Sequence, residues 1–242
     1  MTVYFIGAGP GDPELITVKA QRLIRRCQVI LYAGSLVPDA VLNGHRARIV
    51  NTANLNLDTI ISLFSSAHEK GQDIARVHSG DPSLYSTLGE QIRKLKLFGI
   101  PYEIIPGVTS TSACAATLCR ELTLPGITQT VILTRYAGKT IIPKYEKLSA
   151  LASHRATLVI HLSIKYLSNI VDDVLPHYGE DCPVAVVYRA SWPDEISVIG
   201  TLSNIVYKIK CISIKRTALI LIGPVLDREG FTNSTLYSKV VL

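Results

Sequence analysis

Three short segments combine glycine, proline and aspartate in a pattern that suits ligand binding through the backbone. They are residues 7–13 (GAGPGDP), 78–85 (HSGDPSLY) and 106–110 (PGVTS). Glycine has no Cβ and adopts positive φ readily, so a ligand can approach the main chain closely. The first segment lacks the third glycine of a dinucleotide-binding fingerprint and the Gly-Lys-Ser/Thr of a Walker loop. A plain tight turn, which favours the same residues, is the competing interpretation.

Each segment follows a short apolar run that predicts a strand and precedes a stretch that predicts a helix. In the first half, the predicted strands are 3–6, 29–32, 48–51, 73–77 and 102–105, and the predicted helices are 15–26, 58–70, 87–98 and 111–116. This alternation indicates right-handed βαβ units around a mostly parallel sheet. The three segments, with the loop at 33–38, then lie along one sheet edge, where open α/β folds bind ligands.

The pattern breaks at residues 120–128, which have no regular period and contain Pro-Gly. Beyond the break, the predicted strands are 129–134, 156–161, 184–188, 196–201 and 218–222, with a short helix ending at Leu148 and another over 164–175 that Pro176 ends. Residues 184–188 and 196–201 are close enough to pair antiparallel. We predict two α/β domains, each with a mostly parallel or mixed sheet flanked by helices. Their limits are 1–119 and 129–226, with a linker at 120–128 and a tail at 227–242.

Composition narrows the class of protein. Of 242 residues, 48% are hydrophobic, which is ample for a core, and no apolar run reaches the roughly 18 residues of a membrane span. The N-terminus lacks the pattern of a signal peptide. The five cysteines form no CxxC pair, which favours buried thiols in a reducing cytoplasm. The net charge of +6 suits an anionic partner, although a solvated face is the favoured interpretation of the basic residues at 208–216.

Few side chains suggest acid–base or metal chemistry. The six histidines show no zinc-ligand spacing, so we expect no metal. His78 and His161 stand at predicted strand ends, where a structural role and a site role are equally compatible. Asp12 and Asp81 each lie between glycine and proline, which suits helix capping or ligand contact. A chain of backbone-rich loops without acid–base groups suits methyl transfer from S-adenosylmethionine (SAM), because the sulfonium is already activated and alignment supplies most of the remaining catalysis.

These segments, in this order and spacing, resemble the tetrapyrrole methylases of cobalamin and sirohaem synthesis from residue 1 to about residue 226. Three further stretches, 31–37, 122–135 and 188–195, resemble the branch of that family that methylates C-11 of precorrin-4 or cobalt-precorrin-4. The resemblance implies a SAM-dependent methyltransferase with its active site in the cleft between two domains. It also implies a homodimer acting on an anionic tetrapyrrole. From the resemblance and the composition together, we expect a cytoplasmic protein with no nucleic acid or membrane partner.

The resemblance also implies site residues. By motif position, the SAM contacts are Pro10, Gly80, Asp81, Leu84, Thr109, Ser110, Leu162, Ala190 and Ala218. The residues expected to bind the tetrapyrrole are Gly9, Ser35, His78, Tyr85, Arg135 and Arg189; the two arginines suit its carboxylates. Some members carry an aspartate where Gly34 stands in this sequence. No general base is therefore assigned, and the catalytic residue is unknown.

Three alternatives remain open. One is another tetrapyrrole methylase activity on the same fold. The second is a SAM-dependent RNA methyltransferase, which the positive charge permits, although no aromatic platform with interleaved basic residues is present. The third is a tetrapyrrole carrier or sensor without SAM, which leaves the segments around Gly80 and Thr109 without a role.

Overall fold

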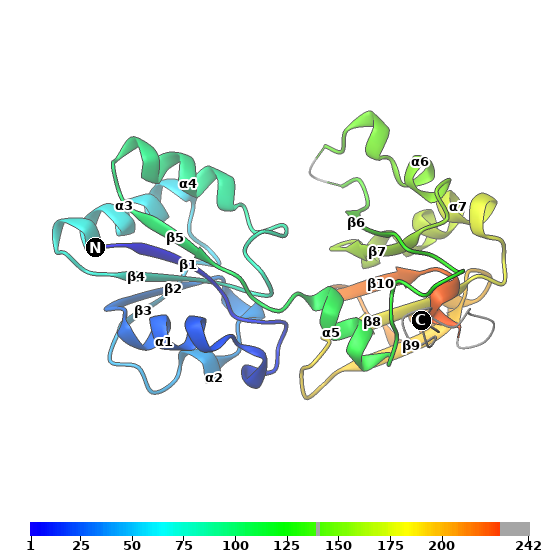
Figure 1. Cartoon of the computed structure of the whole chain (residues 1–242), viewed down its shortest axis with the longest axis horizontal. Coiled ribbons are helices and arrows are strands. Elements are labelled where there is room, and N and C mark those ends of the chain that lie inside the picture. The colour runs from blue at the N-terminus through cyan, green and yellow to red at the C-terminus, as the bar shows by residue number, and fades with distance from the viewer. Residues whose placement is uncertain (139–140, 228–242) are drawn as a thin grey trace, which may run out of the picture. The chain divides into compact units, whose positions relative to one another are not determined.

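The computed structural model describes residues 1–138 and 141–227 (Figure 1). Contacts between Cα atoms divide the chain into two compact units, Met1–Ala113 and Cys114–Leu242. This division falls inside α5 (Ser110–Thr117), and the predicted domain and linker limits stay predictions. Most of the predicted tail, residues 228–242, lies outside the described residues. No described helix is long and apolar enough to cross a bilayer.

The first unit is built on a five-stranded sheet whose neighbouring strands all run parallel. The strands in spatial order are β3 (Arg48–Asn51), β2 (Val29–Tyr32), β4 (Ile74–His78), β1 (Val3–Gly7) and β5 (Tyr102–Ile105). Every residue of β1 and β4 is buried, as expected for central parallel strands covered on both faces. The predicted parallel sheet is thus confirmed for this unit.

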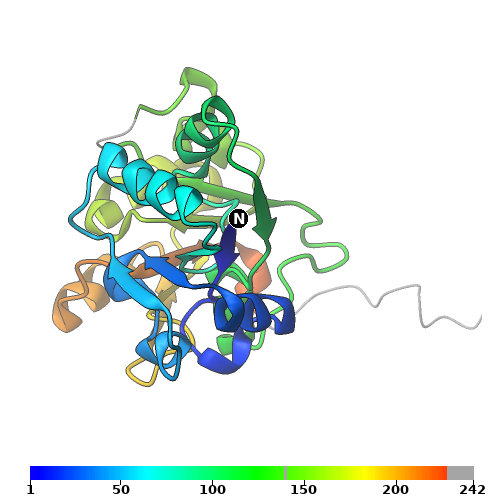
Figure 2. The same ribbon diagram turned by 90° about the vertical axis from the view of Figure 1, so that its left-hand side faces the viewer.

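Helices cover both faces of this sheet (Figures 1 and 2). Helices α1 (Val18–Arg26) and α2 (Asp39–Leu42) pack on one face, and α3 (Leu57–Glu69) and α4 (Leu88–Leu97) pack on the other. The predicted helix at 15–26 is divided. A 3₁₀ turn, η1 (Pro13–Leu15), comes first, and α1 begins after Thr17, whose side chain accepts a hydrogen bond from the N–H of Ala20.

The second unit contains a mixed five-stranded sheet. In spatial order its strands are β6 (Val131–Arg135), β7 (Thr157–His161), β10 (Ala218–Ile222), β8 (Pro183–Tyr188) and β9 (Ile196–Thr201). Strands β6 and β7 are parallel, whereas β10 is antiparallel to both of its neighbours. The predicted antiparallel pairing of 184–188 with 196–201 is confirmed by β8 and β9.

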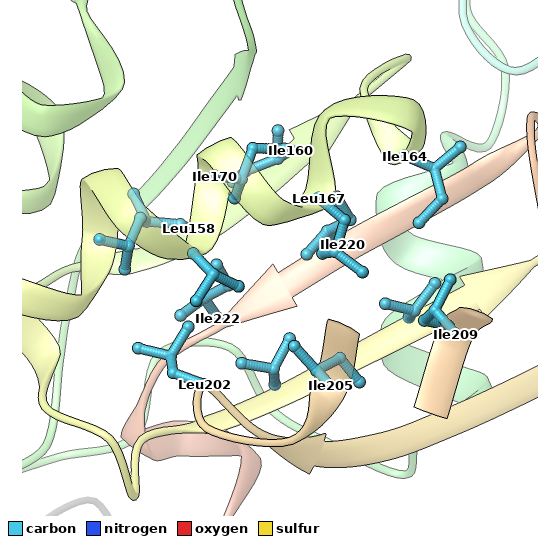
Figure 3. Close-up of a cluster of buried hydrophobic side chains, with 14 of the residues drawn as sticks. Leu158, Ile160, Ile164, Leu167, Ile170, Leu202, Ile205, Ile209, Ile220 and Ile222 are labelled. Carbon is cyan, nitrogen blue, oxygen red and sulfur yellow. The ribbon is translucent and has the colours of Figure 1, made fainter. Parts of the chain in front are cut away.

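The core of this unit lies between the sheet and the helices α7 (Leu167–Tyr178) and α8 (Ile205–Ile212). Figure 3 shows Leu167 and Ile170 of α7 on one side of Ile220, with Ile205 of α8 on the other. The remaining short helices of the second unit are η3 (Lys144–Glu146), α6 (Leu148–Ala152), η4 (Ile164–Tyr166) and η5 (Pro224–Leu226).

Three sequence expectations are wrong, and one helix was not predicted. Pro176 lies inside α7 and does not end it, because a proline in the last turn loses one hydrogen bond while packing of the apolar face holds the helix. The helix expected to end at Leu148 begins there as α6. The basic stretch near Lys208 was not predicted as a helix, yet Ile205 and Ile209 give α8 a buried face at i, i+4 spacing. The thiols at positions 119 and 211 are exposed.

Candidate functional site

The carboxyl ends of the parallel strands gather the predicted residues of the first half at one edge. The loops after β1, β2, β4 and β5 all leave from this edge, because the four strands share one direction. They carry Gly9, Pro10, Ser35, His78, Gly80, Asp81, Leu84, Tyr85, Thr109 and Ser110. Ser35 lies in η2 (Gly34–Leu36), and Tyr85 has a positive φ of 55°.

The loops after β1, β4 and β5 contact one another through bare backbone. Gly9 and Gly80 form an isolated bridge, in which Gly80 N lies 2.7 Å from Gly9 O and Gly9 N lies 3.3 Å from Gly80 O. A Cβ on Gly107 would lie 2.3 Å from Gly80 O, and a Cβ on Gly7 would lie 2.7 Å from the Cα of Gly107. Side chains are therefore excluded at positions 7 and 107, and the three loops are held as one rigid backbone surface.

The space in front of Gly80 is bordered by main-chain groups. A Cβ on Gly80 would lie 3.9 Å from Val108 O and 4.0 Å from Ser110 N, with no closer neighbour. Gly80 also has a φ of +63°, which side chains rarely adopt. A backbone carbonyl oxygen and a backbone amide nitrogen thus lie about 4 Å from the position that a side chain at Gly80 would occupy. This arrangement fits a small polar ligand such as SAM held mainly by main-chain groups.

Asp81 ties the loop after β4 to the loop after β5. Its Oδ2 accepts a hydrogen bond from Gly107 N at 2.8 Å, and its Oδ1 accepts from Ser83 N at 2.7 Å and from the Ser83 hydroxyl. Burial raises the pKa of Asp81, but the hydrogen bonds from Ser83 and Gly107 outweigh it and hold the pKa below its usual value. Asp81 orders the loops and caps no helix, whereas Asp12 caps η1 through Glu14 N at 2.8 Å.

His78 is placed inside the first unit, with only 4% of its surface exposed. Burial, with a smaller contribution from the charge of Arg76, lowers the pKa of His78 from 6.5 to about 3, so the ring is neutral at physiological pH. Its Nε2 has no hydrogen-bond partner among the described residues, and the ring centroid lies 6.0 Å from that of Phe5. The assignment of His78 to tetrapyrrole binding stays a prediction.

Arg76 is a buried cation that the sequence analysis missed. Its guanidinium donates to Gln91 Oε1 at 3.1 Å and to Thr52 Oγ1 at 2.8 Å, and burial lowers its pKa from 12.5 to about 10. No described carboxylate forms an ion pair with it. The signal in the sequence was a single charge within the otherwise apolar run 74–77.

The second unit gathers the remaining predicted residues at one edge of its mixed sheet. Because β10 runs antiparallel to β7 and β8, its first residue, Ala218, lies beside the ends of both strands. Leu162 follows β7, and Ala190 follows the residue after β8. Arg135 and His161 lie opposite each other in the register of β6 and β7, at the last position of each strand. Ala190 and Ala218 are buried, whereas Leu162 is 63% exposed. Burial lowers the pKa of His161 to about 4.

The loop after β8 is held by a network that was also missed. Glu195 Oε2 accepts hydrogen bonds from Ser191 N at 2.6 Å and from Thr117 Oγ1 at 2.9 Å. Arg189 forms an ion pair with Asp194 at 2.8 Å, and its guanidinium carbon lies 4.1 Å from the centroid of the Trp192 ring. Arg189 and Ser191 both have positive φ, at 48° and 66°. The loop around Ala190 is therefore fixed in an unusual backbone conformation.

Comparison with known proteins identifies the family. Residues 2–206 match the family of tetrapyrrole (corrin/porphyrin) methylases. A precorrin-4 C(11)-methyltransferase from Pseudomonas aeruginosa is 64% identical over 238 residues, which cover 98% of this chain and 95% of that protein.

Solved structures show the same fold. The X-ray structure of a cobalamin biosynthetic enzyme, cobalt precorrin-4 methyltransferase, superposes with a TM-score of 0.91 and 41% identity, covering 93% of this chain and 96% of that one. A uroporphyrin-III C-methyltransferase from Thermus thermophilus, in complex with S-adenosylhomocysteine, gives a TM-score of 0.79 and 29% identity, covering 93% and 99%. The fold, the edge loops and these matches lead to one conclusion: the chain belongs to the tetrapyrrole methylase family.

Proposed function

We propose that this chain transfers a methyl group from SAM to C-11 of precorrin-4 or cobalt-precorrin-4 in cobalamin biosynthesis. The observation that carries the proposal is the 64% identity, over 98% of the chain, to a protein named for that reaction. The TM-score of 0.91 to a cobalt precorrin-4 methyltransferase supports the same reaction.

The reaction requires little acid–base chemistry from the protein. The methyl carbon leaves the sulfonium sulfur, which keeps the electron pair of the broken bond and becomes the thioether of S-adenosylhomocysteine. The electron pair of the new carbon–carbon bond comes from the tetrapyrrole. Alignment of donor and acceptor is therefore the main task of the protein, and rigid backbone loops such as those around Gly9, Gly80 and Gly107 suit it.

SAM binding is assigned to the loops at the two sheet edges. The first unit contributes Pro10, Gly80, Asp81, Leu84, Thr109 and Ser110, and the second contributes Leu162, Ala190 and Ala218. The opening in front of Gly80, bordered by Val108 O and Ser110 N, supports the assignment for the first unit. The residues proposed for the tetrapyrrole remain Gly9, Ser35, His78, Tyr85, Arg135 and Arg189.

The direct test is incubation of the purified chain with SAM and precorrin-4, and separately with its cobalt form, followed by mass detection of one added methyl group. Isotopic labelling of the SAM methyl and NMR of the product assign the carbon. Methylation at a carbon other than C-11 would point to a different tetrapyrrole methylase activity, and methylation of RNA alone would reject the proposal.

The SAM assignment is tested at Gly80. Asparagine tolerates positive φ better than other residues with side chains, so Gly80→Asn places a side chain in the opening at modest cost to the fold. Calorimetry should show at least tenfold weaker binding of S-adenosylhomocysteine, with the circular dichroism spectrum unchanged. Gly71→Asn, at a positive φ with no neighbour within 4 Å, is the matched control. Unchanged affinity in Gly80→Asn would remove this loop from the site.

The proposed binding of the tetrapyrrole by Arg135 and Arg189 is tested with a separate variant of each arginine. Arg135→Ala and Arg189→Ala should raise the KM for the tetrapyrrole, because each removes a partner for a carboxylate. Arg189 already pairs with Asp194, so Asp194→Asn should strengthen tetrapyrrole binding if Arg189 takes part. An unchanged KM in both alanine variants would contradict the assignment.

Assembly and location complete the proposal: the chain works as a homodimer in the cytoplasm. The family resemblance supports the dimer, and light scattering of the purified chain tests it. A mass corresponding to one copy at micromolar concentration would reject the dimer.

A further inference from the structure

The first unit contains a groove of about 560 Å³ whose lining includes none of the residues around Gly80. It is formed by α1, α2 and the turn after α2. Its lining includes the partly buried Ile16 and the buried side chains of Ile24 and Val41, and its two cationic residues are Arg25 and Arg46. No aspartate or glutamate lines it. The groove therefore combines a small apolar surface with two guanidinium groups.

The two arginines have no partner within the described part of the chain. Neither the side chain of Arg25 nor that of Arg46 forms a hydrogen bond or an ion pair with a described residue. Their neighbour Arg26, by contrast, donates to Tyr4 Oη at 2.6 Å and pairs with Asp73 at 3.1 Å. Since guanidinium groups bind carboxylates in a two-point geometry, Arg25 and Arg46 are suited to an external anion.

The groove is continuous with the first of the backbone loops. Pro13, the last residue of the segment 7–13, is part of its lining, and Ile16 follows three positions later. The end of this loop and the groove therefore adjoin at Pro13. An apolar side chain beside two guanidinium groups suits a flat ring that bears carboxylate arms, in which the ring packs on the partly exposed Ile16 while the carboxylates meet the arginines.

We propose that this groove binds one carboxylate-bearing pyrrole ring of the tetrapyrrole, with Arg25 and Arg46 as the partners of its acid side chains. The inference rests on the proposed function, because it takes the tetrapyrrole as the substrate. It adds a substrate subsite on α1 and α2, outside the loops that are assigned to SAM.

The double variant Arg25→Gln/Arg46→Gln removes both charges and keeps polar side chains. The KM for precorrin-4 should rise about three- to tenfold, as expected for two solvent-accessible charge pairs. The kcat and the calorimetric Kd for S-adenosylhomocysteine should stay within twofold of the unmodified chain. Arg22→Gln is the matched control, since Arg22 is also exposed on α1 but does not line the groove.

A second variant fills the groove without changing charge. Ala40 is exposed on α2 and lines the groove, so Ala40→Phe should raise the KM for precorrin-4 by a similar factor. Circular dichroism and thermal unfolding confirm that both variants fold. An unchanged KM in the folded double variant and in Ala40→Phe would overturn the proposed subsite.

Binding of uroporphyrin III, a stable tetrapyrrole with eight carboxylates, separates this inference from the proposed function. Fluorescence titration measures its Kd without turnover. Weaker binding to Arg25→Gln/Arg46→Gln than to Arg22→Gln supports the subsite, and equal binding rejects it. Failure of the unmodified chain to methylate either form of precorrin-4 rejects the proposed function, whatever the titration shows.

Discussion

The carboxylate of Asp81 accepts a hydrogen bond from the backbone N–H of Gly107 at 2.8 Å, across 26 positions of sequence. This bond joins the loop after β4 to the loop after β5. The same carboxylate holds Ser83 N at 2.7 Å, and the neighbouring Gly80 is bridged to Gly9 in the loop after β1. One side chain and two glycines thus connect three strand ends into a single surface.

Replacement of Asp81 should loosen this surface. Asp81→Asn presents an amide N–H₂ to one of two backbone donors, so the free energy of unfolding should fall by about 1–3 kcal/mol. Urea denaturation measures the loss, and calorimetry with S-adenosylhomocysteine should show weaker binding. Asp12→Asn is the control, because asparagine caps a helix start as well as aspartate; its stability should match the parent within about 0.5 kcal/mol. Equal stability of the Asp81 variant would contradict the connecting role.

The contact between Gly107 and Gly80 leaves no room for a methyl group. In Gly107→Ala the new Cβ would meet Gly80 O at 2.3 Å, and we expect a loss of more than about 2 kcal/mol of stability because two backbones must separate. Gly89→Ala adds the same methyl group to α4, where nothing lies within 4 Å, and should stabilise the protein by up to about 1 kcal/mol. Thermal unfolding compares the two, and a similar shift in both would show that position 107 is not constrained.

Buried histidine makes stability depend on pH. The pKa of His78 is about 3 in the folded chain and 6.5 when unperturbed, so below pH 6.5 the unfolded state binds a proton that the folded state does not. Stability is therefore fully present above pH 6.5 and falls toward pH 3, with a slope of up to about 1.4 kcal/mol per pH unit for this group. His161 acts in the same direction, with a pKa of about 4.

Substitution of His78 tests whether this residue causes the slope of stability against pH. His78→Phe should reduce the slope of unfolding free energy against pH between pH 6.5 and pH 4 by up to about 1.4 kcal/mol per pH unit, and the part that comes from His161 should remain. Urea denaturation at each pH measures the slope. His68 is exposed at the end of α3, so His68→Gln should retain the slope of the parent. A parental slope in His78→Phe would indicate that His78 is protonated in the folded chain.

Glu195 positions the loop that carries Ala190. Glu195→Ala removes the acceptor for Ser191 N and for Thr117 Oγ1, and should cost about 1–3 kcal/mol and raise the Kd for S-adenosylhomocysteine. Glu195→Gln keeps one carbonyl oxygen that can accept both bonds, and should restore most of the affinity. Thr117→Val removes one of the two bonds and should give an intermediate result. If Ala and Gln variants bind equally well, the hydrogen bonds do not position the loop.

The strands and the loops at their ends could be predicted from short stretches of the sequence alone. Apolar runs such as 3–6 and 218–222 predicted strands, and the glycines, prolines and aspartates of residues 7–13 and 78–85 predicted loops at the strand ends. These features can be predicted from sequence because each depends on a few adjacent residues and on the φ values that those residue types prefer. The family resemblance rested on the same segments, and the comparisons confirm it.

Tertiary structure decided the features that depend on residues far apart in the chain. The bond from Asp81 to Gly107, the hydrogen bonds of Glu195 to Thr117 across 78 positions and the groove beside Arg25 and Arg46 arise only when separate loops and helices pack. Burial is likewise a property of the assembled core: His78 and Arg76 lie in a strand whose pattern permits either an edge or an interior position. Their low pKa values follow from loss of hydration, which no local sequence pattern specifies.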